Sequence, residues 1–396
     1  MDKDEQINQL LTKGVSEVLP SKGFVEALLR GKKKLSIYIG VDPTGPTLHI
    51  GHGIQLRKLR QFQDLGHKII FLIGDFTARI GDPTDKLAAR TTLTEKQVKE
   101  NLKRYKKQAS RFILFSGKNP AKVLFNNTWL GKLKFADVLA LASQMTVDQM
   151  LKRDMFARRI EEERPIYIHE FLYPLMQGYD SVAMNVDGEI GGNDQLFNML
   201  AGRTLLKKMK EKEKFVITVK LLEDTSGEKM GKTTGNMVSF LDSPEEMYGK
   251  IMSWTDGMIV PGFELCTDYT MAQVTTINDE LVRGINPRDI KMRLAFEIVK
   301  TCISDKEAQA AEEKFIALFQ KKDAAQSVQE VSAKASLKET LLTSGVVASA
   351  SELRTLVSSG AVSSLTTGKK VDIAALAKRP LPDTYRIGKH RFVRIS

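Results

Sequence analysis

The distribution of hydrophobic residues predicts a strand–helix–strand unit near the N-terminus. Apolar residues alternate with others over 35–41, which is typical of a strand, and a helical pattern follows over about 51–65. The nearly continuous, β-branched run at 68–73 predicts a second, buried strand. Two strands joined by a helix form a βαβ unit, which implies a parallel sheet. Before this unit, residues 4–30 have the pattern of two short helices broken at 19–21.

A second set of sheet elements is predicted further along the chain. Residues 181–186 are apolar and β-branched enough for a strand, and the glycines in 188–192 predict a turn that leads into a helix over 194–209. The run 215–222 predicts a further strand. We therefore expect an α/β domain with a Rossmann-like parallel sheet.

Between the two halves of this sheet, the pattern indicates a helical insertion at about 85–180. Apolar residues recur every three or four positions over 94–113, and 147–163 also has a helical pattern. The opposite face of the first of these helices carries four lysines, namely Lys99, Lys103, Lys106 and Lys107. Such a face is either simply solvated or in contact with an RNA backbone, and the sequence leaves both readings open.

Beyond the last predicted strand, the pattern becomes helical up to about residue 321. An Ala-, Ser-, Gln- and Lys-rich stretch at 322–336 is typical of a flexible linker. We therefore predict four parts. They are a Rossmann-like α/β domain (1–240), an α-helical domain (241–321), the linker (322–336) and a small α+β module (337–396).

The charge of the chain points to a polyanionic partner. The 396 residues include 60 Lys and Arg against 48 Asp and Glu, a net charge of +12. Residues 331–396 alone hold 11 basic and 4 acidic residues, which is a net +7. A basic excess concentrated in the last sixth of the chain indicates an appended nucleic-acid-binding module.

Several classes of protein are excluded by composition. No window approaches the roughly 18 apolar residues of a membrane span, and the acidic, polar N-terminus does not have the pattern of a secretory signal. Cys266 and Cys302 are the only cysteines, which excludes a disulfide framework and a Cys-rich zinc site. We expect a reduced, cytoplasmic protein with no contact to membranes.

Two imidazoles stand where the first predicted strand gives way to a helix. His49 and His52 are three residues apart, and a helix N-terminus favours an anion such as phosphate. Gly51 and Gly53 lack side chains, so a flat group can approach the backbone there. A zinc pair and histidines that only pack the helix are the alternatives, although no Cys or third His lies nearby.

A second candidate motif is the polar, glycine-punctuated loop at 228–236, which follows a predicted strand. Lys229 and Lys232 lie three residues apart on this loop and are suited to clamping a triphosphate. Taken alone, the loop could equally be a solvated basic loop. The phosphate-binding interpretation gains support from the two histidines predicted at the same sheet.

Together the two motifs carry a resemblance. HIGH at 49–52 followed by KMGKT at 229–233 resembles the signatures of the class I aminoacyl-tRNA synthetases, of which the second is usually KMSKS. Further strings make the chain similar to the bacterial-type tyrosyl-tRNA synthetases from about residue 5 to 396, namely YIGVDPT at 38–44, IGDPT at 80–84, YPLMQGYD at 173–180 and GGNDQ at 191–195. The C-terminal segment is similar to a small RNA-binding module also found in a ribosomal protein.

The resemblance implies a role for each residue that matches a family motif. Tyrosine would be bound by Tyr38, Asp82, Tyr173, Gln177, Asp180 and Gln195. ATP would be bound by Asp42, Thr44, His49, Gly51, His52, Gly192, Asp194, Lys229, Met230 and Lys232. The catalytic residues among them would be Thr44, His49, His52, Lys229 and Lys232. Tyr38 and Asp180 would hold the phenol hydroxyl of the substrate, whereas Tyr173, Gln177 and Asp82 would surround its ammonium group.

The resemblance also implies substrates and partners. ATP would bind together with Mg²⁺, which needs no protein cage of its own, so no protein metal site is expected. The helical domain would face the anticodon arm of tRNA, and the C-terminal module would grip the tRNA through its basic residues. The insertion is where this family forms a homodimer, so two-fold assembly is expected.

The chain departs from the family pattern at a few positions. Gly231 and Thr233 replace the two serines of the second signature, and both lysines are kept. Asp85 stands where the family commonly has Gly, and Asn193 stands where Thr or Ser is usual. These changes affect local loop geometry rather than the expected reaction.

Three other functions remain as alternatives. The tryptophanyl enzyme shares the fold and signatures, but the pair of Tyr38 and Asp180 and the basic module argue against it. A ligase that adenylates a small acid and never meets RNA would not need the +7 tail. An RNA-binding scaffold without catalysis would have no use for the histidines and lysines of both signatures.

Overall fold

The computed structural model describes residues 2–82, 93–223, 237–319, 329–347, 349–388 and 391–396. The chain divides into two compact units, residues 1–309 and 310–396, and the division falls within helix α16 (Asp305–Phe319). Among the described residues, no helix has both the length and the apolar character needed to cross a membrane.

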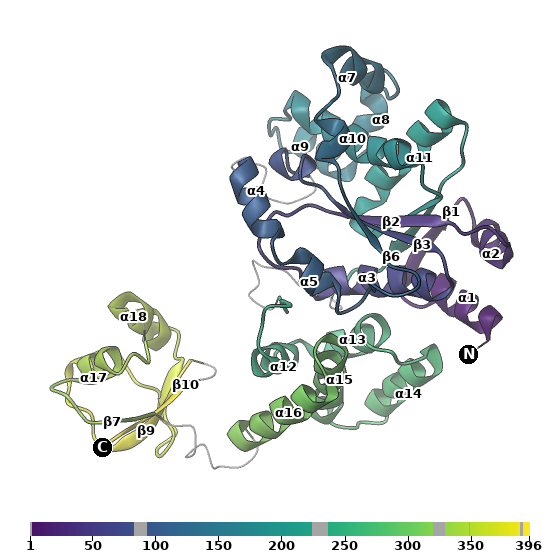
Figure 1. The fold of residues 1–396 in the computed structure, drawn as a ribbon. Helices are drawn as coiled ribbons and strands as arrows, with labels where there is room; N and C mark the ends of the chain where they lie inside the picture. Colours follow the sequence, from purple (N-terminus) through teal and green to yellow (C-terminus); the bar gives the residue numbers. More distant parts are fainter. Residues whose placement is uncertain (1, 83–92, 224–236, 320–328, 348, 389–390) are drawn as a thin grey trace. The chain divides into compact units, whose positions relative to one another are not determined.

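A six-stranded sheet forms the centre of the first unit (Figure 1). Its spatial order is β1-β6-β5-β2-β3-β4, and every neighbouring pair is parallel except β1 with β6. The strands are β1 (Val15–Leu19), β2 (Ser36–Val41), β3 (Lys68–Ile73), β4 (Lys122–Phe125), β5 (Gly188–Gly192) and β6 (Phe215–Val219). Because β5 and β3 flank β2, the two halves of the chain meet at this central strand.

Helices pack on both faces of this sheet. In Figure 1, α1 and α3 lie on one side of the strands, and α10 and α11 lie together on the other. The helices before β6 are α1 (Lys3–Thr12), α2 (Lys22–Arg30), α3 (Ile50–Asp64), η1 (Thr77–Arg79), α4 (Glu95–Leu102), α5 (Tyr105–Ala109), α6 (Asn127–Leu130), α7 (Phe135–Ala142), α8 (Val147–Leu151), α9 (Asp154–Glu161), α10 (Ile168–Met184), η2 (Asn193–Gln195) and α11 (Leu196–Lys210). The predicted βαβ unit of β2, α3 and β3 is confirmed.

The strand predicted at 181–186 is wrong, because these residues end helix α10 and its cap. A short apolar run does not distinguish a strand from a buried helix turn. The glycines read as a turn instead form β5, whose five residues are all buried. A Cβ atom on Gly188 would lie 2.1 Å from the ring of Phe215. Glycine is therefore needed at this position of β5 because the Phe215 ring packs directly against it.

Other boundaries also differ from the prediction. Residues 15–19, expected within a helical stretch, form edge strand β1. The predicted helices over 94–113 and 147–163 are each interrupted, giving α4 with α5 and α8 with α9. Periodicity continues across such breaks because the same face stays buried, so the pattern alone does not locate them.

A helical region completes the first unit. It contains α12 (Pro244–Met252), η3 (Asp256–Met258), α13 (Ile259–Cys266), α14 (Met271–Val282), α15 (Pro287–Cys302) and the start of α16. Helix α12 begins with a capping box, in which the Ser243 side chain accepts the Glu246 N–H and the Glu246 carboxylate accepts the Ser243 N–H. Helix α15 packs against α12 and α13 through a largely apolar buried face.

The second unit contains a four-stranded sheet in the order β7-β10-β9-β8. Its elements are β7 (Gln329–Val331), α17 (Leu337–Thr343), α18 (Ala350–Ser358), β8 (Val362–Ser364), η5 (Ala374–Ala377), β9 (Asp383–Ile387) and β10 (Arg391–Ile395). The linker predicted over 322–336 is therefore wrong at 329–331, which pair in parallel with β10. Residues 320–328 lie outside the described residues.

Candidate active site

The two histidines form the N-terminal cap of α3. The Nδ1 atom of His49 accepts the Gly51 N–H at 3.2 Å, and the Nδ1 atom of His52 accepts the His49 N–H at 3.2 Å. Their ring centroids are 4.0 Å apart. A Cβ atom on Gly51 would lie 3.0 Å from the His49 ring, so a larger residue would disturb the pair. Each imidazole is therefore oriented through one nitrogen at a helix end that favours anions.

Asp42, in the turn after β2, is held by hydroxyl groups from η1 and α10. Its Oδ1 atom accepts from the Thr77 hydroxyl at 2.6 Å and its Oδ2 atom from the Tyr173 hydroxyl at 2.8 Å. Desolvation raises the pKa of Asp42 to about 7, although both hydroxyls oppose the shift, and the negative charges of Asp82 and Asp75 raise it further. Thr44 lies in the same turn, and its N–H donates to the Asp42 carbonyl.

Tyr38 and Asp180 are both buried but have different partners. The Tyr38 hydroxyl lies 2.9 Å from the Ser181 hydroxyl. Asp180 accepts from Trp129 Nε1 at 2.7 Å and from Asn126 Nδ2 at 3.2 Å. Burial raises the pKa of the Tyr38 phenol well above 10, and the charges of Glu189 and Asp180 add to this shift. The Asp180 carboxylate is thus near the phenol without being directly bonded to it in the structure.

Burial also raises the pKa of Asp180 well above its usual value. The hydrogen bonds from Trp129 and Asn126 oppose this shift because N–H donors favour the charged form. Asn126 also donates to the Thr77 hydroxyl at 3.0 Å, so one hydrogen-bond chain connects Asp180 to Asp42.

Asp82 forms a separate polar cluster. Arg153 Nη2 donates to its Oδ1 atom at 2.7 Å, and Gln195 Nε2 donates to Oδ2 at 2.9 Å. Asn198 Nδ2 contacts both Asp82 and Gln195. Gln177, which is expected beside Asp82 at the substrate ammonium group, donates through Nε2 to Glu189 at 3.5 Å. The pKa of Tyr173 is raised well above its usual value. Burial is the largest cause, the charge of Asp42 is the second, and the charge of Asp82 is the third.

The remaining predicted residues fall into two groups. Gly192 ends β5 beside Asp194 in η2, and a Cβ atom on this glycine would lie 2.5 Å from Asp194 Oδ1. Asn193 accepts from the Thr218 hydroxyl at 3.2 Å. Lys229, Met230 and Lys232 lie outside the described residues, as do Gly231, Thr233 and Asp85.

The structure adds polar residues that the sequence did not single out. They are Thr77, Asn126, Trp129, Arg153, Ser181, Glu189, Asn198 and Lys214. Lys214 belongs to the lysine-rich stretch between α11 and β6, where nothing in the sequence separates it from solvated lysines. A lysine directly before a fully buried strand is the one local sign that could have found it.

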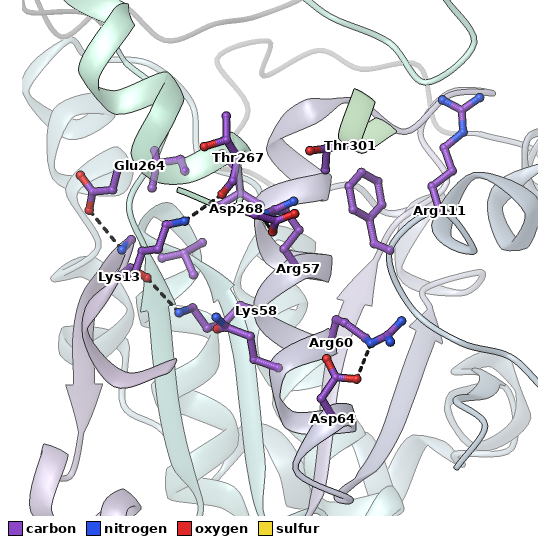
Figure 2. Close-up of a pocket in the computed structure, with 16 residues that line it drawn as sticks. Lys13, Arg57, Lys58, Arg60, Asp64, Arg111, Glu264, Thr267, Asp268 and Thr301 are labelled. Carbon is purple, nitrogen blue, oxygen red and sulfur yellow. Dashed lines mark hydrogen bonds and ion pairs between the residues drawn. The ribbon is translucent and has the colours of Figure 1, made fainter. Parts of the chain in front are cut away.

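A cavity of about 320 Å³ lies elsewhere in the first unit (Figure 2). It is lined by charged side chains from α3, from the C-terminal end of α13 and from the residues that follow α13, and none of the predicted tyrosine- or ATP-binding residues lines it. Lys58 donates to the Leu10 and Lys13 carbonyls, and Lys13 donates to the Thr267 carbonyl. The lining is therefore a set of contacts that ties α3 to the helical region.

No group of three or more metal-ligating side chains occurs among the described residues. The expectation that the protein has no metal site of its own stays a prediction.

Comparison with known proteins identifies the family. Residues 30–320 match the family described as tRNA synthetases class I (W and Y). A tyrosine–tRNA ligase of Carboxydothermus hydrogenoformans is 42% identical, covering 100% of this chain and 99% of the relative, and one of Thermotoga maritima is 41% identical, covering 100% and 98%.

Solved structures share the fold. A C-terminally truncated mitochondrial tyrosyl-tRNA synthetase of Aspergillus nidulans aligns with a TM-score of 0.64 at 23% identity, over 79% of this chain and 94% of that one. A tyrosyl-tRNA synthetase of Archaeoglobus fulgidus complexed with L-tyrosine aligns with a TM-score of 0.61 at 22% identity, over 79% and 100%. The expected Rossmann-like α/β domain thus agrees with these solved structures, and the chain belongs to the class I tRNA synthetases and, within them, to the bacterial-type tyrosyl-tRNA synthetase family.

Proposed function

We propose that this chain charges tRNA with tyrosine in two steps. The carboxylate of L-tyrosine attacks the α-phosphorus of ATP, which forms tyrosyl-adenylate and releases pyrophosphate. A hydroxyl of the terminal ribose at the 3′ end of tRNA then attacks the tyrosyl carbonyl carbon, and AMP leaves. The observation that carries the proposal is the cluster of buried polar side chains around Tyr38 and Asp180, in the same α/β sheet domain as the imidazole-capped helix α3.

The first step needs positioning and charge stabilisation more than proton transfer. The attacking carboxylate is already ionised at pH 7, so no general base is required. His49 and His52, already oriented by the helix cap, are suited to donate to phosphate oxygens as negative charge moves toward pyrophosphate. Thr44, Gly51, Gly192 and Asp194 would complete the ATP site, and Lys229, Met230 and Lys232 would close over it with Mg²⁺ bound to the nucleotide.

Selection of tyrosine rests on the phenol hydroxyl. This group has one donor and one acceptor, so a carboxylate and a donating hydroxyl satisfy it fully. Asp180 accepts one hydrogen bond on each oxygen and is suited to accept a further one from the phenol O–H, while the Tyr38 hydroxyl would bond to the phenol oxygen. Phenylalanine would offer neither hydrogen bond and would still displace water from these two polar groups, which costs about 1–3 kcal/mol for each buried group that loses a partner.

Around the ammonium group of the substrate, the pocket offers acidic and amide side chains. Tyr173, Gln177, Asp82 and Gln195 would gather there, with Asp42 at the junction with ATP. In the structure Tyr173 is bonded to Asp42 and Gln195 to Asp82. Binding of the ammonium group would therefore exchange some of these contacts for new ones.

Recognition of tRNA is assigned to the helical part (241–321) and to the C-terminal module (337–396). The described part of the module exposes a set of basic side chains, namely Arg354, Lys369, Lys370, Lys378, Arg379 and Arg386. Such residues contact phosphates and make RNA binding sensitive to salt.

A homodimer through the insertion is supported by apolar side chains left exposed there. They are Phe135, Leu139, Val147, Ile160, Tyr167 and Ile168. Ile168 is 82% exposed and Phe135 is 77% exposed, which is unusual for large apolar residues so close in sequence.

The test of the function is exchange of labelled pyrophosphate into ATP without tRNA. Tyrosine is expected to support exchange, and tryptophan and phenylalanine serve as controls. Exchange with tryptophan instead would assign the chain to the sister activity. Absence of exchange with all three amino acids would overturn the adenylation step.

A further inference from the structure

The most unusual group near the candidate tyrosine pocket is the ammonium of Lys214. Lys214 directly precedes β6, and its side chain is fully buried. Its Nζ atom is ion-paired with Glu189 of β5 and donates to the Ser181 hydroxyl of α10 at 2.8 Å. Three elements of the fold therefore converge on one buried charge.

The surrounding structure makes room for this lysine. A Cβ atom on Gly202 of α11 would lie 2.8 Å from Lys214 Nζ and 2.9 Å from Ser181 Oγ. Burying an ion pair stabilises a fold little or not at all compared with apolar residues of similar volume, because both charges lose their hydration. Stability alone therefore gives little reason for this arrangement, and its position suggests another role.

The buried pair reaches the candidate pocket through Ser181. The Ser181 hydroxyl lies 2.9 Å from the Tyr38 hydroxyl, and Lys214 Nζ lies 5.8 Å from the centre of the Tyr38 ring. Glu189 also accepts from Gln177, which is assigned to the same pocket. Both ends of the pair thus contact side chains proposed to touch tyrosine.

The direction of the hydrogen bond between Lys214 and Ser181 determines how Ser181 can bond to Tyr38. An ammonium group only donates, so Ser181 Oγ accepts from Lys214. The single hydroxyl proton of Ser181 is then available for the Tyr38 oxygen. The Glu189 carboxylate also hydrogen-bonds the Tyr38 hydroxyl, so the buried pair holds this hydroxyl from two sides. Burial lowers the pKa of Lys214, and the charge of Glu189 opposes this and helps keep the ammonium form.

We propose that Lys214, paired with Glu189 and acting through Ser181, is a positioning residue that fixes the orientation of the Tyr38 hydroxyl toward the phenol oxygen of tyrosine. This inference rests on the proposed function. Without the Lys214–Glu189 pair or without the Ser181 hydroxyl, the Tyr38 hydroxyl is free to rotate, and its alignment with the substrate phenol is lost. We call the contacts from Lys214 through Ser181 to Tyr38 the relay. The relay contributes to the preference for tyrosine over phenylalanine, although Lys214 does not touch the substrate.

The test uses two variants of the full chain. Lys214→Met/Glu189→Gln removes both charges at similar volume, and Ser181→Ala breaks the relay while keeping the ion pair. In pyrophosphate exchange, we expect each variant to raise the KM for tyrosine about tenfold, as expected for one lost hydrogen bond to a neutral group. The KM for ATP, and the Ki of phenylalanine as a competitor of tyrosine, are expected to stay within twofold of their original values.

The matched control is Lys291→Met in α15. Lys291 is another buried lysine, and it donates to the Trp254 carbonyl in the helical region. This variant should leave the ratio of tyrosine KM to phenylalanine Ki unchanged.

Two results would overturn the relay. One is an unchanged ratio of tyrosine KM to phenylalanine Ki in the relay variants. The other is equal weakening of both amino acids together with a lower melting temperature, because that pattern indicates a purely structural role. Failure of the unmodified chain to exchange with tyrosine would instead contradict the proposed function.

Discussion

At the scale of single residues, the candidate site is defined by buried acids with different hydrogen-bond partners. Asp42 is held by two hydroxyl donors, Asp180 by two N–H donors, and Asp82 by a guanidinium and two amides. Guanidinium and amide donors stabilise a carboxylate in a polar cluster, whereas desolvation disfavours its charge. Burial raises the pKa of both Asp42 and Asp180 above the usual value of a carboxyl group.

Asp42 gives the site a testable pH dependence. Its pKa of about 7 means that it is largely neutral below pH 7 and charged above it. Because a charged Asp42 attracts the substrate ammonium, tyrosine affinity should rise by up to about tenfold per pH unit below pH 7 and level off above it. Calorimetric titration of L-tyrosine between pH 5.5 and 8, without ATP, measures this.

Variants of the same contact provide the control. Tyr173→Phe removes a donor that favours the charged carboxylate, so the inflection should move to higher pH. Asp42→Asn should remove the inflection altogether. Tyrosine affinity that does not change over this range would contradict a role for Asp42 near the ammonium group.

At the scale of elements, helix α3 links two regions of the first unit. Its first turn carries the imidazole cap, and Arg57 and Lys58 in its later turns bind residues outside the sheet. Arg57 is ion-paired with Asp268, which follows α13 (Figure 2). A movement of the helical region would therefore pull on the helix that carries both histidines.

The buried lysines at this junction predict a pH-dependent stability. Burial lowers the pKa of Lys58 to about 7 and that of Lys13 to about 8, whereas both are near 10.5 when unfolded. Above pH 7 the unfolded chain therefore holds more protons, so the free energy of unfolding should rise with pH. The slope is at most about 1.4 kcal/mol per pH unit for each lysine.

Thermal unfolding between pH 7.0 and 8.5 measures this slope. Lys58→Met removes one titrating group, so the melting temperature of this variant should depend less steeply on pH. Lys32→Met, on the exposed segment before β2, is the control and should keep the original slope. Equal slopes in all three proteins would show that Lys58 stays charged in the fold.

At the scale of the whole molecule, assembly is predicted from the exposed apolar residues of the insertion. Ile168→Asp places a charge in the first helical turn of α10, where an acid is tolerated, so the fold should persist. We expect this variant to sediment at half the mass of the unmodified protein. Val282→Asp, 79% exposed at the end of α14, should leave the mass unchanged. A monomeric unmodified protein would contradict the proposed dimer.

The second unit should affect tRNA binding without affecting adenylation. Lys369→Glu/Lys370→Glu reverses two exposed charges, so tRNA affinity should fall and its salt dependence should become shallower. The expected change in the slope of log K against log salt is about 0.7–0.9 per lost phosphate contact. Filter binding at several salt concentrations measures this, and pyrophosphate exchange should be unaltered. Lys32→Glu/Lys34→Glu is the matched control.

The sequence determined the family and the positions of most candidate residues. HIGH at 49–52 follows a strand, and the strand after α3 is continuously apolar, so both could be placed from local pattern. The histidines and Asp42 follow a parallel strand, where the geometry of βαβ units gathers functional groups. Local pattern gave the wrong prediction for β5. Its glycines predict a turn, whereas in the structure Gly188 makes room for the ring of Phe215 within a strand.

Only the tertiary structure decided which side chains meet. Ser181 and Lys214 are 33 residues apart, and Lys214 meets Glu189 because β5 and β6 pair in one register. The motifs suggested that Tyr38 and Asp180 act as a pair. In the structure the Tyr38 hydroxyl bonds to Ser181, and Asp180 accepts from Trp129. Local sequence sets propensity and periodicity over a few residues. Burial of a charge and the direction of a hydrogen bond depend on groups brought together from distant strands and helices.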